Sequence, residues 1–313
     1  MQLRSVSRAG LSVVAVVVLS GVTAACESSS ATATSAVPDA RPAGTQALTI
    51  TPVPTAWPSV IGLPYADMPK SPTYEQTLPL FAYQGDRPFD MVASVKSTTV
   101  GATVEDVIFV GAAGEPVEAY LVLPDGDGPF PAVLYEHGSN GSRNDFLPEA
   151  TAVAQQQHIA GLVVTQPDWT MFDDALTETI YQVREMRRAL DFLASVPKVN
   201  TTRLGYVGHS LGAILGTVLL SVDSRVKAAV MMSDVPGYGL PSLDLSLYAP
   251  HITSGTVLFQ FGRDDSYYTQ DEANGFAALV PTTKTVTWYD AGHVLNDAAR
   301  ADRAAWLSQQ LVS

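Results

Sequence analysis

Residues 208–212 are Gly-His-Ser-Leu-Gly, so Ser210 lies between two glycines at G-x-S-x-G spacing. In this pattern a sharp strand-to-helix turn presents a serine hydroxyl for nucleophilic attack. The turn needs glycines because a side chain at either position would collide with neighbouring backbone. Residues 203–207 are typical of a short buried strand and residues 213–220 of a buried helix, which is the context that the pattern requires. The stretch therefore predicts that Ser210 is a nucleophile.

A serine hydroxyl needs a base to take its proton, and the base needs a carboxylate that orients it. Of the five histidines, His293 directly follows the last expected strand, where a loop can deliver its ring to the serine. His209 lies inside the motif, and its side chain should point away from that of Ser210. His137 ends an earlier strand and is expected to shape the loop there, while the other two histidines have ordinary surface or turn contexts. We predict that His293 is the base.

Two adjacent aspartates, Asp264 and Asp265, follow the strand expected at 255–261. Both lie at the end of the strand where the partners of the serine must gather, although an aspartate in such a turn also serves purely local geometry. Asp265 has Gly-x-x-Asp spacing from Gly262. We predict Asp265 as the orienting acid, and Asp264 is the alternative.

Attack on a carbonyl also requires two backbone N–H donors placed where negative charge develops. One donor is expected to be the N–H of Leu211, which directly follows the nucleophile. The other should come from residues 137–141, His-Gly-Ser-Asn-Gly, where the N–H of Ser139 is favoured because glycines let the backbone approach a ligand closely. The sequence has no nucleotide-binding glycine motif, no HExxH and no paired cysteines, so neither a cofactor nor a metal is expected.

Strands and helices alternate along the chain, and they must position these residues. An antiparallel pair is expected at 104–110 and 117–123, followed by strands at 131–135, 161–165, 203–207, 226–232, 255–261 and 284–289. Helices are expected near 146–157, 175–196, 213–220, 269–280 and 297–312. This alternation predicts a mostly parallel sheet with helices on both faces.

The segment 234–254 is too short for a large lid. Aromatic and Met side chains that could line a substrate pocket are Trp169, Met171, Phe172, Tyr238, Tyr267 and Tyr268.

These segments together resemble α/β-hydrolases of the dienelactone-hydrolase-like and acetyl-esterase-like branch. The resemblance covers residues 100–313 and rests on residues 124–138 (PDGDGPFPAVLYEHG), 208–212, 262–265 and 292–293. The order Ser210, Asp265, His293 along the chain is the order of that fold. Dienelactone hydrolases proper have a cysteine where Ser210 stands, and the Gly-His-Ser-Leu-Gly turn is also similar to that of secreted lipases and polyester hydrolases. The resemblance implies the α/β-hydrolase fold and a serine esterase. We expect its substrates to be esters of small or medium acyl groups.

The single cysteine, Cys26, follows Arg4, Arg8, an apolar run at 9–19 and the small residues Thr-Ala-Ala. This arrangement resembles a bacterial lipoprotein signal, which implies cleavage before Cys26 and lipid attached to its sulfur. An ordinary secretory signal and an uncleaved membrane helix are the alternatives. We therefore expect a protein anchored through its N-terminal lipid to the outer face of the bacterial cell membrane.

The expected organisation is a signal peptide at 1–25, a tether rich in Ser, Thr, Ala and Pro at 26–60, an irregular lead-in at 61–95 and the α/β-hydrolase domain at 96–313. Aromatic residues of the lead-in are available as anchors on the domain: Tyr65, Tyr74, Phe81, Tyr83 and Phe89. The 46% of hydrophobic residues predict a substantial apolar core, and a net charge of −13 argues against nucleic-acid binding.

Two function classes remain. The first is a lipid-anchored serine hydrolase that cleaves small-molecule carboxylic esters, with a peptidase or amidase, or a polyester or lipid hydrolase, as the alternative on the same residues. The second is a non-catalytic lipoprotein that keeps the fold for binding. The complete set of Ser210, Asp265 and His293 favours the enzyme, since a binding scaffold does not need it.

Overall fold

The structure is a computed structural model that describes residues 72–166, 175–234 and 244–313. The predicted signal peptide, Cys26 and the tether lie outside the described residues. So do four of the six candidate pocket residues: Trp169, Met171, Phe172 and Tyr238.

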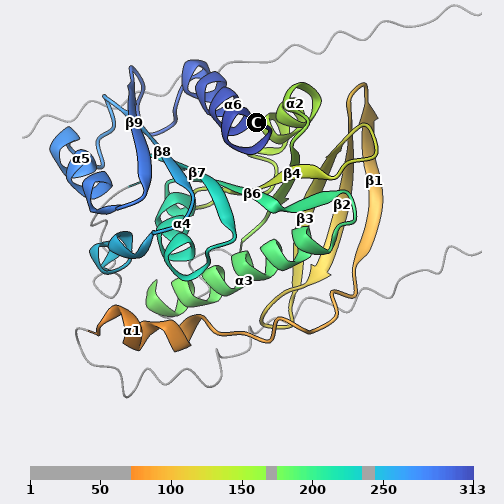
Figure 1. The fold of residues 1–313 in the computed structure, drawn as a ribbon, viewed down its shortest axis with the longest axis horizontal. Helices are drawn as coiled ribbons and strands as arrows, with labels where there is room; N and C mark the ends of the chain where they lie inside the picture. The colour runs from red at the N-terminus through yellow and green to blue at the C-terminus, as the bar shows by residue number, and fades with distance from the viewer. Residues whose placement is uncertain (1–71, 167–174, 235–243) are drawn as a thin grey trace, which may run out of the picture. The chain divides into compact units, whose positions relative to one another are not determined.

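The described strands form one nine-stranded sheet in the order β1-β2-β3-β5-β4-β6-β7-β8-β9 (Figure 1). Their bounds are β1 (Val92–Thr99), β2 (Ala102–Val110), β3 (Pro116–Pro124), β4 (Phe130–Glu136), β5 (Ala160–Val164), β6 (Val199–His209), β7 (Val226–Met232), β8 (Thr256–Gly262) and β9 (Thr283–Tyr289). β1 pairs with β2, β2 with β3 and β3 with β5 in antiparallel fashion, and all pairs from β5 to β9 are parallel. The predicted mostly parallel sheet, opened by an antiparallel pair, is confirmed.

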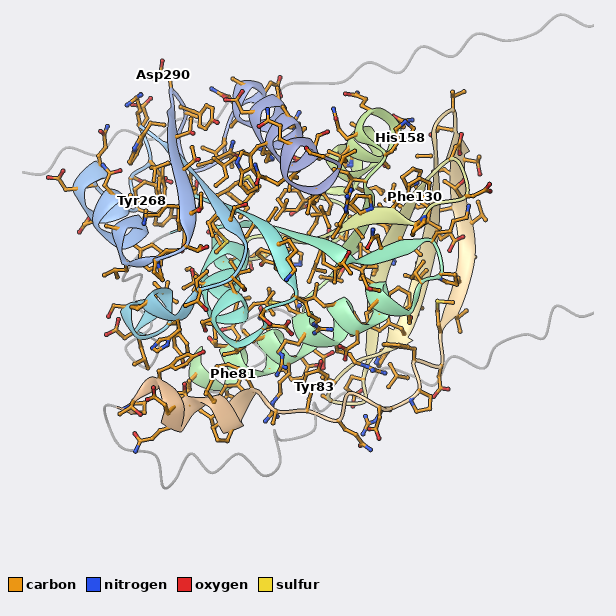
Figure 2. The ribbon with its side chains drawn as sticks, viewed as in Figure 1. Phe81, Tyr83, Phe130, His158, Tyr268 and Asp290 are labelled. Carbon is orange, nitrogen blue, oxygen red and sulfur yellow. The ribbon has the colours of Figure 1, made fainter. Side chains whose placement is uncertain are left out.

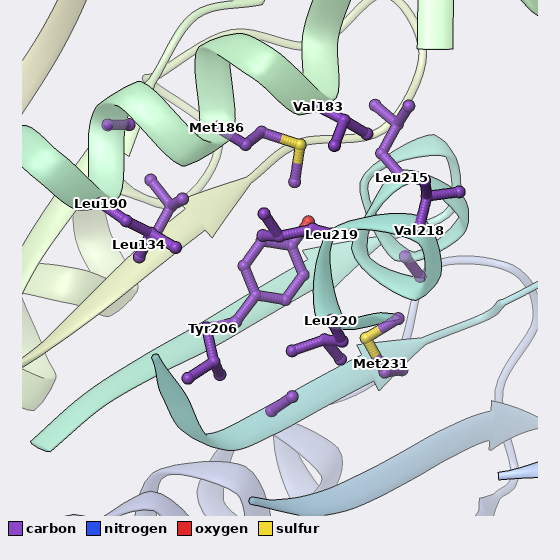
Figure 3. Packing of buried hydrophobic residues seen from close by; sticks show 14 of the residues in the cluster. Leu134, Val183, Met186, Leu190, Tyr206, Leu215, Val218, Leu219, Leu220 and Met231 are labelled. Carbon is purple, nitrogen blue, oxygen red and sulfur yellow. The ribbon is translucent and has the colours of Figure 1, made fainter. Parts of the chain in front are cut away.

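Helices cover both faces of this sheet, as predicted. Their bounds are α1 (Tyr74–Thr77), α2 (Leu147–Gln157), α3 (Ala175–Ser195), α4 (Leu211–Val222), α5 (Gln270–Leu279) and α6 (Asp297–Leu311), with single 3₁₀ turns η2 (Leu78–Phe81), η4 (Leu245–Leu247) and η5 (Ala249–His251). Buried residues of α2 and α6 pack on one face, and those of α3, α4 and α5 pack on the other. Figure 3 shows part of the second layer, where Leu134 and Tyr206 from the sheet meet Met186 from α3 and Leu219 from α4.

The central strands β4 and β5 are buried along nearly their whole length because helices cover both faces of the sheet. In β4, for example, every residue after Phe130 is buried. Because β4 to β9 run parallel, their carboxyl ends lie side by side. This geometry gathers Glu136, Ser210 and Gly262 toward one edge of the sheet.

The edge strand β1 was not predicted, and its first residues lie in the stretch expected to be irregular. All of its side chains are exposed, and the pairing with β2 shifts register between Val95 and Ser97. A strand without a buried face has no hydrophobic alternation that a sequence pattern can reveal.

The described part of the lead-in, from residue 72, forms hydrogen bonds with α3. Tyr83 donates its hydroxyl proton to Asp191 Oδ2 at 2.8 Å, and Arg187 donates to the carbonyl oxygen of Phe81 at 2.8 Å. Figure 2 shows Phe81 and Tyr83 beside this helix. Within the described ranges, no helix has both the length and the apolar character needed to cross a bilayer.

Candidate active site

Ser210 lies in the turn between β6, which ends at His209, and α4, which begins at Leu211. Its backbone angles are φ 53° and ψ −116°, a left-handed conformation that costs a non-glycine residue about 1–3 kcal/mol. The surrounding hydrogen bonds hold the residue there, since its N–H donates to the carbonyl of Met232 at 2.9 Å and its own carbonyl accepts from Ala213 at 2.8 Å. The strained turn projects the serine side chain from the end of the sheet.

The two glycines of the motif are required by close backbone contacts. A Cβ on Gly208 would lie 2.5 Å from the carbonyl oxygen of Gly212, and a Cβ on Gly212 would lie 2.5 Å from the carbonyl oxygen of Glu136. Both obstacles are backbone atoms, which cannot rotate away as a flexible side chain can. The strand β4 therefore packs directly against the start of α4, and only glycine permits this approach.

We expect Gly212→Ala to lower the free energy of unfolding by on the order of 3 kcal/mol, because the new methyl group meets fixed backbone. Gly275→Ala is the matched control, since a Cβ there on α5 has nothing within 4 Å. That substitution should raise stability by about 0.5–1 kcal/mol, the usual gain from replacing a helical glycine. Urea unfolding of both variants measures the free energies. Equal free energies of unfolding for Gly212→Ala and Gly275→Ala would contradict the close backbone contact at Gly212.

His293 joins the serine to a buried carboxylate. Its Nε2 lies 2.8 Å from Ser210 Oγ, and its Nδ1 lies 2.7 Å from Asp265 Oδ2. A carboxylate can only accept, so Nδ1 carries the ring proton and Nε2 is free to accept the serine proton. The Asp265 side chain is fully buried, and its second oxygen accepts from the N–H of Tyr267 at 3.0 Å. The arrangement has the geometry of an activated serine nucleophile.

The neighbouring Asp264 makes no such contact. Asp264 is exposed, and its backbone N–H donates to the carbonyl oxygen of Ala291 at 3.0 Å. Of the two aspartates left open by the sequence, the structure brings Asp265 to His293.

The backbone of His293 is also held in place. Its carbonyl oxygen accepts from His209 Nε2 at 2.9 Å and from the Ser233 hydroxyl at 2.9 Å. Because a carbonyl only accepts, His209 carries its proton on Nε2, and burial lowers the pKa of this imidazole so that it stays neutral. His209 therefore positions the loop of His293. The sequence indicated neither this contact nor the part that Ser233 plays in it.

The two predicted backbone donors, Ser139 and Leu211, line one cavity of about 300 Å³. Leu211 is the first residue of α4, so its N–H has no partner within the helix and lies at the positive end of the helix dipole. The loop carrying Ser139 lies against the nucleophile, since a Cβ on Gly138 would be 3.3 Å from Ser210 Cβ. The structure thus brings the predicted donor residues together beside Ser210.

His137 fixes this loop, in agreement with the sequence-based expectation. Its Nε2 accepts from the N–H of Gln166 at 3.1 Å, so Nδ1 carries the proton and donates to the carbonyl oxygen of Gly138 at 2.7 Å. Burial lowers the pKa of His137, which keeps the ring neutral and both contacts intact.

A buried carboxyl group, Glu136, also lines the cavity and was not identified from the sequence. Gln166 Nε2 donates to its Oε2 at 3.2 Å, and loss of hydration raises its pKa from 4.5 to about 8. The available signal was a glutamate at the end of the apolar run Ala-Val-Leu-Tyr, where a charged side chain is unusual.

This shift makes stability depend on pH. The folded state holds the Glu136 proton up to about pH 8, whereas the unfolded chain releases it above pH 4.5, so the folded state binds more protons in this window. Stability therefore falls as the pH rises from 5.5 to 8, by on the order of 3 kcal/mol for this group. We expect Glu136→Gln to remove that part of the dependence. Urea unfolding of both proteins at the two pH values measures this loss of stability. An equal loss in the wild type and in Glu136→Gln would contradict its assignment to Glu136.

Comparisons with known proteins find similarity to esterases. Residues 90–244 match the family model described as Esterase FrsA-like. The chain is 26% identical over 178 residues to Esterase FrsA from Escherichia coli O157:H7 and, to the same extent, to Esterase FrsA from Escherichia coli strain K12 / DH10B. Each match covers 55% of this chain and 41% of the relative. The chain thus spans about two fifths of the length of these curated relatives.

Solved structures with the same fold include esterases. The acetyl xylan esterase from Paenibacillus sp. R4 has a TM-score of 0.62 at 19% identity and covers 76% of this chain and 93% of its own. Acetyl Xylan Esterase 1 from Thermoanaerobacterium sp. JW/SL YS485 has a TM-score of 0.59 at 18% identity, and the match covers 77% of this chain and 92% of that esterase. These likenesses confirm the predicted α/β-hydrolase fold.

Proposed function

We propose that this protein hydrolyses carboxylic esters of small or medium acyl groups through an acyl-enzyme intermediate on Ser210. The observation that carries the proposal is the unbroken hydrogen-bonded sequence from Asp265 through His293 to Ser210 Oγ. The esterase relatives support the reaction type. A cavity of about 300 Å³ lies at the lower end of the sizes usual for small-molecule sites, which favours short acyl groups.

In the first half of the reaction, Ser210 Oγ attacks the ester carbonyl carbon while His293 Nε2 takes the hydroxyl proton. Asp265 stabilises the imidazolium that forms. The carbonyl oxygen becomes an oxyanion, which accepts hydrogen bonds from the N–H groups of Leu211 and Ser139. His293 then gives its proton to the leaving alcohol oxygen as the bond between carbonyl carbon and that oxygen breaks.

In the second half, water replaces the alcohol. His293 Nε2 removes a proton from the water, whose oxygen attacks the acyl carbon on Ser210. The tetrahedral intermediate collapses when His293 returns the proton to Ser210 Oγ, and the free acid leaves. The same groups thus act in both halves, and the net reaction consumes one ester and one water.

A panel of p-nitrophenyl esters of increasing acyl length, with aminoacyl anilides of matched size, tests the proposal. We expect acetate to hexanoate esters to be hydrolysed and to have much larger kcat/KM values than the anilides. Anilide cleavage as fast as ester cleavage would favour the peptidase or amidase alternative. A maximum at long, water-insoluble acyl chains would favour a lipid or polyester hydrolase. If none of these compounds is hydrolysed, the result would favour the alternative that the protein is a non-catalytic binding lipoprotein.

We further propose that the protein is exported and anchored by lipid on Cys26 to the outer face of the cell membrane. The support is the single cysteine that follows Thr-Ala-Ala and the apolar run at 9–19. Cys26→Ser should release the protein from the membrane fraction or leave it unprocessed, whereas Ser28→Ala should behave as wild type. A mature wild-type chain that begins elsewhere, found by mass spectrometry of its N-terminal peptide, would contradict the proposal.

A further inference from the structure

The loop between β4 and α2 carries the proposed oxyanion donor Ser139 and is anchored to the antiparallel strands by Arg143. Arg143 Nη1 donates to Asp106 Oδ1 on β2 at 2.7 Å and to the carbonyl oxygen of Ala119 on β3 at 3.0 Å. Arg143 Nη2 lies 3.2 Å from Glu118 Oε2, also on β3. Three acceptors from two strands therefore hold one guanidinium, whose rigid fork of donors suits such a site.

This guanidinium is packed as well as hydrogen-bonded. It lies over the ring of Tyr120, with 4.2 Å between Cζ and the ring centroid, at the distance of a cation–π contact. Only 14% of the Arg143 side chain is exposed, compared with 55% for Arg300, which pairs with Asp297 on the surface of α6. Because water and salt screen a partly buried pair less than an exposed one, we expect the contacts of Arg143 to hold its side chain in one geometry.

The backbone beside this side chain is also attached to the sheet. The N–H of Arg143 donates to Thr165 Oγ1 at 3.2 Å. Thr165 directly follows β5 and lines the cavity that Ser139 lines. The Tyr120 hydroxyl donates to Asn144 Oδ1 at 3.4 Å. Residues 143 and 144 are therefore held from β3 and from the end of β5 at the same time.

The chain between this anchor and the oxyanion donor is folded tightly. The N–H of Gly141 donates to the carbonyl oxygen of Gly138 at 3.0 Å. A Cβ on Gly141 would meet Asp145 Oδ2 and would lie 2.8 Å from His137 Nδ1, so side chains from both ends of the loop pack onto this glycine. A segment packed in this way moves as a unit, and a displacement of the anchored residues shifts the N–H of Ser139 as well.

Given the proposed ester hydrolysis, on which this role depends, we propose that Arg143 is a positioning residue that holds the N–H of Ser139 where the oxyanion forms. The donor stabilises negative charge that develops in the transition state, so a displaced loop lowers kcat and leaves KM nearly unchanged. A misplacement of about 1 Å at a catalytic group costs on the order of 10²-fold in rate. The antiparallel strands β2 and β3 thereby contribute to catalysis through the loop.

Arg143→Met tests the proposal, because methionine keeps an unbranched aliphatic stem and has no N–H to donate. We expect kcat for p-nitrophenyl acetate to fall by about 10- to 100-fold, with KM within about threefold of the wild-type value. Arg203→Met is the matched control. Arg203 also donates to backbone carbonyl oxygens, at the end of α6, and it lies beside the start of β4, at the opposite end of that strand from the loop. This variant should keep the wild-type kcat.

A second substrate separates the oxyanion donors from the triad. In p-nitrophenyl thionoacetate, sulfur replaces the carbonyl oxygen, and sulfur is a weak hydrogen-bond acceptor. Aligned N–H donors therefore favour the ester, and the wild-type protein should have a higher kcat/KM for it. Arg143→Met should lower this ester-to-thionoester ratio by at least about threefold. Damage to the triad slows both substrates alike and leaves the ratio unchanged.

Asp106→Ala keeps the test available if Arg143→Met does not fold, because it removes one acceptor of the anchor from a side chain that is 34% exposed. It should lower kcat and the ester-to-thionoester ratio in the same direction, by at least about threefold and by less than Arg143→Met. Since both substitutions act on one contact, the combined variant should lose no more activity than Arg143→Met alone.

Wild-type kcat in folded Arg143→Met or in folded Asp106→Ala would overturn the positioning role. A loss of kcat at an unchanged ester-to-thionoester ratio would also overturn it, as would a raised KM at unchanged kcat. Equal kcat/KM values of the wild-type protein for the two substrates would do the same, since no oxyanion donor would then be aligned. If the wild-type protein does not hydrolyse p-nitrophenyl acetate, the proposed function itself is refuted.

Discussion

Ser210→Ala is expected to lower kcat for p-nitrophenyl acetate by on the order of 10⁶-fold, the loss seen when a serine hydrolase is deprived of its nucleophile. The reason is that Ser210 Oγ is the atom within hydrogen-bonding distance of His293 Nε2, at 2.8 Å. The substitution removes one oxygen and should leave the fold unchanged by circular dichroism. Steady-state kinetics of purified wild type and variant measure the loss.

Ser221→Ala is the matched control, because Ser221 lies on the same helix α4 and its hydroxyl donates to the carbonyl of Val218, away from the triad. Its activity should equal that of the wild type. A Ser210→Ala protein that keeps more than about 1% of wild-type kcat would be incompatible with a nucleophile whose loss costs several orders of magnitude.

Asp265→Asn is expected to lower kcat by about 10⁴-fold, since an asparagine can stabilise the wrong tautomer of His293 and cannot balance the imidazolium charge. Asp264→Asn is its control and should change kcat by less than about tenfold, the scale of a local turn effect. The geometry behind this contrast is the 2.7 Å contact of Asp265 Oδ2 with His293 Nδ1, against the exposed side chain of Asp264. The reverse ranking in folded, purified variants would identify Asp264 as the acid.

The sequence predicted those features whose cause is local. The Gly208–Gly212 turn is specified by two glycines that backbone contacts require, and the apolar runs of the central strands follow from burial on both faces. Because the carboxyl ends of parallel strands meet at one edge, chain order was enough to expect that Ser210, Asp265 and His293 meet there. The choice between Asp264 and Asp265 rested on one residue of spacing, and the three-dimensional path of a short turn decided which one reaches the imidazole.

Contacts between distant segments could not be predicted in this way. Ser233 and His209 hold the carbonyl oxygen of His293 from two different strand ends, and nothing in their local sequence indicates a shared partner. Glu136 and Gln182 line the same cavity because α3 packs against the sheet near β4. The edge strand β1 was not predicted for another reason. All of its side chains are exposed, so its sequence lacks the alternation of apolar and polar residues on which strand prediction rests.

Treatment of the purified protein with a fluorophosphonate, followed by peptide mass spectrometry, tests the central claim most directly. Trypsin cleavage after Arg203 and Arg225 isolates residues 204–225, which contain Ser210. The triad predicts one label per molecule on this peptide at Ser210, with labelling lost in Ser210→Ala and strongly slowed in Asp265→Asn. Equal labelling of wild type and Ser210→Ala, or a label at another residue, would contradict the assignment of Ser210 as the nucleophile.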